Sequence, residues 1–106
     1  MPTKFKSIYR CALYGLSHHY YSLHARNIQA GDELTLERDV GDRFDDFAIK
    51  VKYGEDQIGW IPKGQNEILA RLLDAEYDLR ARVLSHDTSL SLDHRLYVNV
   101  YIAVAE

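Results

Sequence analysis

Four side chains between residues 44 and 63 combine the chemistry of a ligand-binding site. Phe44 and Asp45 stand just before one predicted strand, and Trp60 and Lys63 stand on and just after the next one. A hairpin would bring these two aromatic rings, one acid and one base close together in space. Aromatic faces stack on planar groups, and charged side chains form strong hydrogen bonds with hydroxyls and anions. This combination indicates binding rather than catalysis.

A second group of ring-bearing side chains precedes this segment. His19, Tyr20 and Tyr21 follow the first predicted strand, in a stretch without clear periodicity. Stacking a nucleic-acid base on an aromatic ring contributes about 1–3 kcal/mol and tolerates any base. The two tyrosines could supply such stacking only if at least one ring faces solvent. The alternative is that one ring belongs to the core and the other to the surface.

The remaining reactive side chains form no recognisable catalytic or metal site. His18, His19 and His24 lack a helical frame and a nearby acid or cysteine at ligand spacing. Cys11 is the only cysteine, has no evident base, and stands in an apolar strand pattern typical of a buried thiol. There is no glycine-rich phosphate loop or serine elbow. We therefore expect no enzyme, no metal and no cofactor.

The elements that must position these side chains follow from hydrophobic periodicity. Alternating residues predict strands over about 5–14, 34–36, 47–53, 58–60, 79–83 and 96–104. Apolar residues at helical spacing predict the main helix over about 65–75, and a short helix is expected near 19–26. Residues 85–95 are expected to form a polar loop. Six strands and one main helix predict a mostly β, closed or partly closed antiparallel barrel in a single domain, 1–106, because closure removes exposed sheet edges.

The charge is distributed unevenly along the 106 residues, although the net charge is only −3. The first 31 residues hold four bases and no acid, whereas the rest hold nine bases and sixteen acids. The weakly acidic net charge of the chain argues against non-specific binding along duplex DNA, which needs a broad basic face. It leaves room for a small pocket that takes one nucleic-acid end. The start lacks the apolar region of a signal peptide and no apolar run could span a membrane, so we expect a cytoplasmic protein.

Several short motifs follow one another in an order typical of a known family. The matching segments are Tyr20-Tyr21-Ser22, then 31–39 (Gly-Asp, an apolar strand and Glu-Arg-Asp), Phe44-Asp45, 48–51 (Ala-Ile-Lys-Val) and 58–63 (Ile-Gly-Trp-Ile-Pro-Lys). Together they resemble the HIRAN domain, a small module at the N-terminus of some SWI/SNF-type helicase-like ATPases and a free-standing protein in bacteria. The resemblance covers about residues 9–84.

The resemblance implies an OB-like six-stranded barrel that binds the free 3′ end of single-stranded DNA. It assigns stacking to Tyr20 and Tyr21, the 3′-hydroxyl contact to Asp45 beside Phe44, and the phosphate and base side to Trp60 and Lys63, with His19 where better-known members have Arg. The chain departs from the family pattern at Arg43, in place of Pro, and at Phe47, in place of Asn.

A second function class stays open at this point. Tyr97 and Tyr101 lie on the outer face of the last predicted strand, and exposed aromatic faces often contact other proteins. An OB-like barrel without DNA binding could then serve as a protein-interaction or assembly module. Its partner would be a second copy of the chain, or a helicase or nuclease.

Overall fold

The strands and helices alternate along the chain much as the periodicity predicts. The computed structural model describes residues 3–18 and 20–105. The strands are β1 Thr3–Ala12, β2 Glu33–Arg38, β3 Ile49–Tyr53, β4 Asp56–Trp60, β5 Leu79–His86 and β6 Leu96–Ala105. The helical segments are a 3₁₀ turn Leu16–His18 (η1), α1 Tyr21–His24, α2 Glu67–Asp74 and α3 Leu92–Arg95.

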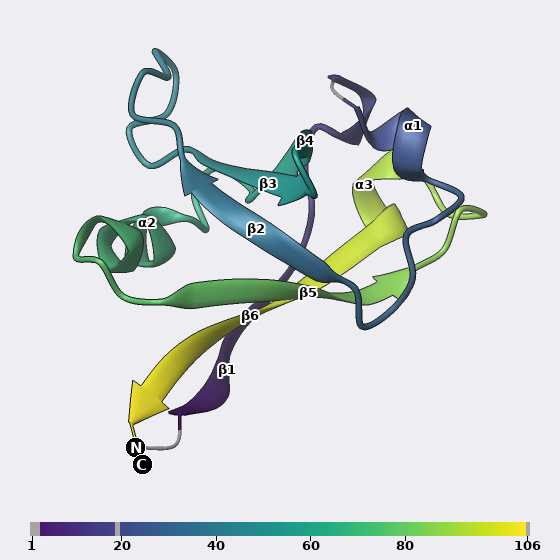
Figure 1. Cartoon of the computed structure of the whole chain (residues 1–106). Helices are drawn as coiled ribbons and strands as arrows, with labels where there is room; N and C mark the ends of the chain where they lie inside the picture. Colours follow the sequence, from purple (N-terminus) through teal and green to yellow (C-terminus); the bar gives the residue numbers. More distant parts are fainter. Residues whose placement is uncertain (1–2, 19, 106) are drawn as a thin grey trace.

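All six strands belong to one antiparallel sheet, in the order β1-β6-β5-β2-β3-β4 (Figure 1). The sheet does not close into a continuous barrel, because its two edge strands, β1 and β4, are not paired with each other. The chain just after β1 reaches β4 through one isolated bridge, in which Tyr14 and Trp60 exchange two backbone hydrogen bonds of 2.9 and 2.8 Å. The predicted mostly β, six-stranded antiparallel class is confirmed, and this bridge brings the sheet's two ends together.

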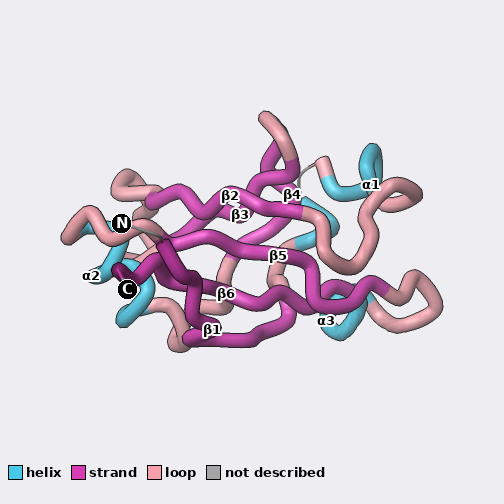
Figure 2. Tube along the Cα trace, turned by 60° about the horizontal axis from the view of Figure 1, so that its bottom comes forward, coloured by secondary structure: helices cyan, strands magenta, loops and turns pink. Residues whose placement is uncertain are grey.

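The helix predicted over 65–75 is confirmed as α2. Leu69 and Ala70 are buried on its inner face, whereas Ile68 is exposed. Figure 2 shows α2 at one end of the sheet, with α1 and α3 near the other end. The short helix expected near 19–26 is present as α1. The polar loop expected over 85–95 is shorter than predicted, because β5 continues to His86 and α3 occupies Leu92–Arg95.

The core lies on the inner face of the curved sheet. Val51, Ile58, Val98 and Val100 are completely buried there. Cys11 is also buried, and burial raises the pKa of its thiol to about 11. The thiol is therefore protonated at neutral pH, which agrees with a packing role.

The helices of the described part are all short. None of those within residues 3–18 and 20–105 has the length and apolarity that a membrane-spanning helix requires.

Candidate functional site

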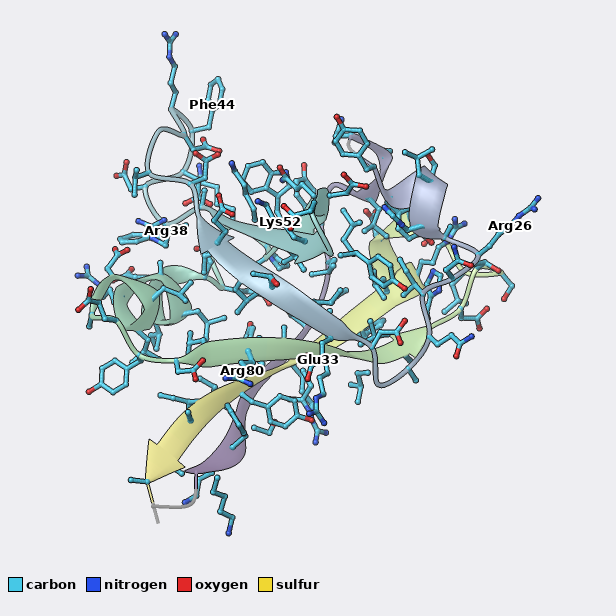
Figure 3. All side chains as sticks on the ribbon, viewed as in Figure 1. Arg26, Glu33, Arg38, Phe44, Lys52 and Arg80 are labelled. Atoms are coloured by element: carbon cyan, nitrogen blue, oxygen red, sulfur yellow. The ribbon has the colours of Figure 1, made fainter. Side chains whose placement is uncertain are left out.

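A turn between β2 and β3 presents Phe44 and Asp45. One carboxylate oxygen of Asp42 accepts hydrogen bonds from the backbone N–H of Phe44 (2.7 Å) and of Asp45 (3.1 Å). Such side-chain-to-backbone bonds replace the pairing that a strand would otherwise provide. The Phe44 ring is left 83% exposed and projects away from the body of the protein (Figure 3). The turn thus presents the Phe44 ring to solvent, where a planar group could stack on it.

The guanidinium group of Arg38 holds the base of this turn. It donates to the carbonyl of Ala48 (2.7 Å) and to the carbonyl of Asp46 (3.0 Å), and it pairs with Asp74 at the end of α2 (3.0 Å). The fork of donors in arginine suits such multiple bonding. The turn is therefore anchored to the sheet and to α2, which keeps Phe44 and Asp45 in place.

Asp45 is fixed by bonds to both of its carboxylate oxygens. Its Oδ1 accepts from the backbone N–H of Phe47 (2.9 Å), and its Oδ2 accepts from the Nδ2 of Asn66 (2.8 Å). Asn66 is 1% exposed and stands at the N-cap position of α2, yet its side chain makes no capping bond. A buried amide that forgoes a helix cap to hold a carboxylate orients that carboxylate firmly.

Trp60 is half-buried and pairs with Tyr14 on one side and with Lys50 of β3 on the other. It lies on the outer face although Ile58 faces the core, because the register between β3 and β4 shifts just before Gly59. The backbone at Gly15 has φ +76°, and a Cβ atom there would lie only 2.9 Å from Cδ1 of the Trp60 ring. Gly59 is buried on the opposite face, where a Cβ atom would lie 3.0 Å from the carbonyl oxygen of Tyr14. Both glycines are thus required by close packing around the bridge, and they place Tyr14 and Trp60 side by side.

Four of the predicted site residues line one cavity of about 490 Å³, which we call the aromatic pocket. Its lining consists of Tyr14, Asp42, Phe44, Asp45, Ala48, Trp60, Ile61, Pro62 and Lys63. The ammonium group of Lys63 donates to the backbone carbonyl of Phe44 across the pocket. The structure therefore brings Phe44, Asp45, Trp60 and Lys63 together, as a hairpin would require.

The two adjacent tyrosines lie apart from this pocket. Tyr20 is 53% exposed, and its backbone N–H donates to the carbonyl of Gln57 near the start of β4 (3.0 Å). Tyr21 is 3% exposed and belongs to the core, so its ring does not face solvent. His19 lies outside the described residues. One tyrosine in the core and one on the surface is the alternative that the sequence left open.

The hydroxyl of Tyr21 has a structural partner. It lies 2.7 Å from the Nε2 of His86, and the Nδ1 of His86 lies 3.0 Å from the carbonyl oxygen of Ile28. Because a carbonyl only accepts, Nδ1 carries the proton, and in the neutral ring Nε2 accepts from Tyr21. This chain of bonds ties α1 and the segment after it to the end of β5.

Replacing Tyr21 with phenylalanine should therefore act on stability and not on binding. The Tyr21→Phe variant leaves the Nε2 atom of His86 without its partner, which costs about 1–3 kcal/mol in the free energy of unfolding. Urea denaturation measures this loss. The matched control is Tyr20→Phe, at the exposed neighbour, which should change stability by less than about 0.5 kcal/mol. Equal effects of the two variants would contradict the structural role of Tyr21.

Tyr14 and Asn66 are the most informative residues of the site that the sequence did not single out. Tyr14 was assigned to a strand, and its bridge to Trp60 joins segments far apart in the chain. Its position directly before Gly15 was the available signal, because a glycine often marks a close approach. Asn66 resembles an ordinary helix cap in the sequence, and only the fold shows that its amide meets Asp45.

The comparisons agree with this fold and with the motif order. The profile of the HIRAN domain matches residues 8–104. A protein from Lactobacillus plantarum has a similar structure, with a TM-score of 0.85 and 20% sequence identity, covering 98% of this chain and 100% of that one. The HIRAN domain of human HLTF is similar with a TM-score of 0.71 and 18% identity, covering 98% of this chain and 81% of that one. No match was found among curated proteins. Since the family profile spans nearly the whole chain, the protein belongs to the HIRAN domain family.

Proposed function

We propose that the aromatic pocket binds the free 3′ end of single-stranded DNA, without catalysis. The observation that carries this proposal is the convergence of Phe44, Asp45, Trp60 and Lys63 with Tyr14 in one cavity. HIRAN domains are known as DNA-binding modules, so membership in the family supports a nucleic-acid ligand. The volume of about 490 Å³ falls in the range of sites that enclose small ligands, which suits a terminal nucleotide.

The aromatic side chains supply the attraction for bases. Tyr14 is 58% exposed and stands beside Trp60, while Phe44 is exposed on the facing turn. Each base that stacks on such a ring gains about 1–3 kcal/mol. We assign stacking to Tyr14, Trp60 and Phe44, and Tyr20 to contact with the strand further from its end.

The polar side chains select the end. A carboxylate has about four acceptor positions, so Asp45 can accept from a hydroxyl while it keeps its bonds to Phe47 and Asn66. The same carboxylate repels a terminal phosphate. Lys63 uses one donor on the carbonyl of Phe44, and an ammonium group has three donors, so it can also bind the phosphate of the preceding linkage.

Fluorescence anisotropy with matched oligothymidylates tests this function. We expect the 3′-hydroxyl oligonucleotide to bind about tenfold more tightly than the same strand with a 3′-phosphate, because about 1.4 kcal/mol of repulsion gives that ratio. An Asp45→Asn variant removes the charge and should bring the ratio close to one. Equal affinity of wild-type protein for the two strands would refute end recognition, and absent binding at low salt would refute nucleic-acid binding altogether.

A further inference from the structure

A second carboxylate lines the aromatic pocket, and the function proposed above leaves it without a role. Asp42 belongs to the same turn as Asp45 and, like Asp45, is half-buried. Its Oδ1 atom accepts from the backbone N–H groups of Phe44 and Asp45. Within residues 3–18 and 20–105, no hydrogen bond or ion pair involves its other oxygen, Oδ2. Asp42 therefore shapes the turn with one oxygen and keeps the other available for a ligand.

The turn holds the two carboxylates near each other. The Oδ1 atom of Asp42 lies 3.1 Å from the backbone nitrogen of Asp45, and the Asp45 side chain starts from the next backbone atom. Phe47 and Asn66 fix the two oxygens of Asp45, with one bond to each oxygen. Since a carboxylate offers about four acceptor positions, each of these oxygens can accept once more. The pocket thus holds two anchored carboxylates with acceptor positions to spare.

The terminal sugar of a strand decides how many of these acceptors find a donor. A 3′-terminal deoxyribose carries one free hydroxyl, whereas a terminal ribose carries two, on adjacent carbons. The additional 2′-hydroxyl is the group by which proteins distinguish RNA from DNA at a given site. Two neighbouring carboxylates match two neighbouring hydroxyls, and each bond formed is charge-assisted. A sugar that lacks one hydroxyl leaves an acceptor of the site without a donor, which disfavours its binding.

The rest of the lining suits a sugar that donates. Ala48 and Ile61 are buried and apolar, so they provide a floor without hydrogen-bonding side chains. Lys63 is the one basic side chain among the described residues of the lining, and it donates to the carbonyl of Phe44. Two acids and one base leave an excess of negative charge. That excess repels a terminal phosphate and favours hydroxyl donors at the strand end.

We infer that Asp42 determines specificity, and that the pocket prefers a strand whose 3′ end is a ribonucleotide, namely that of single-stranded RNA. This inference rests on the end-binding function proposed above, because it concerns the same pocket. Asp45 accepts from the 3′-hydroxyl, and the Oδ2 atom of Asp42 accepts from the 2′-hydroxyl. The aromatic rings stack on the bases of DNA and RNA alike. The preference for ribose therefore depends on Asp42.

Four thymine oligonucleotides that differ only in the 3′-terminal sugar test this preference. The sugars are ribose, deoxyribose, 2′-fluoro-deoxyribose and 2′,3′-dideoxyribose, and anisotropy of a 5′-fluorescein label is measured with EDTA present to exclude bridging metal ions. We expect ribose to bind about tenfold more tightly than deoxyribose, because it adds one hydrogen bond to a charged acceptor. The 2′-fluoro sugar shares the pucker of ribose but donates no hydrogen bond, so it should bind like deoxyribose. The dideoxyribose end should bind most weakly.

These strands separate the inference from the function on which it rests. Equal affinity for ribose and deoxyribose, or the same gain with the 2′-fluoro sugar, would overturn the role of Asp42 while end recognition stands. Equal affinity for deoxyribose and dideoxyribose would instead refute end recognition itself.

Variants then assign the preference to one side chain. Asp42→Asn keeps a carbonyl oxygen for the N–H groups of the turn but replaces the other oxygen with an amide donor. The ribose-to-deoxyribose affinity ratio should fall to about one, while the deoxyribose-to-dideoxyribose ratio persists. The control is Asp46→Asn, which removes the same charge from an exposed neighbour outside the lining and should change neither ratio.

Circular dichroism checks that both variants fold. Asp42→Ser serves as a second variant if the amide disturbs the turn, because a serine hydroxyl can also accept from the backbone and has no second oxygen. A ribose preference that survives both substitutions at Asp42, or that is lost equally in Asp46→Asn, would contradict the assignment.

Discussion

Replacing Trp60 with alanine should weaken binding of a short single-stranded oligonucleotide by about five- to 150-fold. This range corresponds to the loss of one stacked base, about 1–3 kcal/mol. Trp60 lines the aromatic pocket beside Tyr14 and is held there by the backbone bridge between the two residues. Trp60→Phe retains an aromatic face and should recover most of the lost affinity. Anisotropy titrations at fixed low salt measure both variants.

Two further variants separate stacking from folding. Phe44→Ala removes a ring that is 83% exposed, so it should lower affinity without lowering stability. Tyr77→Ala removes a ring that is 53% exposed but stands outside the aromatic pocket, and it should leave affinity unchanged. If Tyr77→Ala weakened binding as much as Phe44→Ala did, the loss would reflect general surface change and the pocket would not be the site.

The second large effect is expected at Gly15. Gly15→Ala should lower the free energy of unfolding by about 2–4 kcal/mol, because two costs add. One cost is a left-handed backbone at φ +76°, and the other is the 2.9 Å approach of the new Cβ atom to the Trp60 ring. The displaced ring should also shift the fluorescence of Trp60, the only tryptophan of the chain, and weaken oligonucleotide binding.

Gly54→Ala is the matched control for Gly15→Ala. Gly54 has a similar backbone, with φ +62°, but nothing lies within 4 Å of the position of its Cβ atom. This variant therefore isolates the backbone cost, about 1 kcal/mol, and should leave both fluorescence and binding unchanged. Urea denaturation followed by circular dichroism compares the two. Equal destabilisation by both variants would contradict the packing of Gly15 against Trp60.

Local patterns in the sequence predict most of the fold. Alternation along the strands and the apolar spacing in α2 depend on neighbours in the chain, so they identified six strands and the main helix. The separation of β2 from β5 beyond Leu34 was not predictable. It depends on where two strands stop pairing, and no local pattern encodes that point. The length of β5 was also missed, because Ser85 and His86 lack the apolar alternation that marks its first residues.

The candidate site also contains residues that the sequence predicts and residues that only the fold reveals. Phe44, Asp45, Trp60 and Lys63 meet because a hairpin joins their strands, and hairpin geometry can be predicted from the sequence. Tyr14 joins them through a bridge between residues 46 positions apart, which is visible only once the sheet has folded. The burial of Tyr21 was equally hidden, since Tyr20 and Tyr21 are identical side chains and only the fold decides which one turns inward.

The most direct test of the central proposal, DNA binding at the aromatic pocket, is a ¹⁵N–¹H NMR titration. The labelled protein is titrated with a short oligothymidylate that carries a free 3′-hydroxyl. We predict that the largest shifts occur at the indole N–H of Trp60 and at the amides of Phe44, Asp45 and Lys63, while the amide signals of Arg80 and Arg82 on β5, outside the aromatic pocket, stay unchanged. Shifts confined to other surfaces, or no shifts at saturating oligonucleotide, would contradict the proposal.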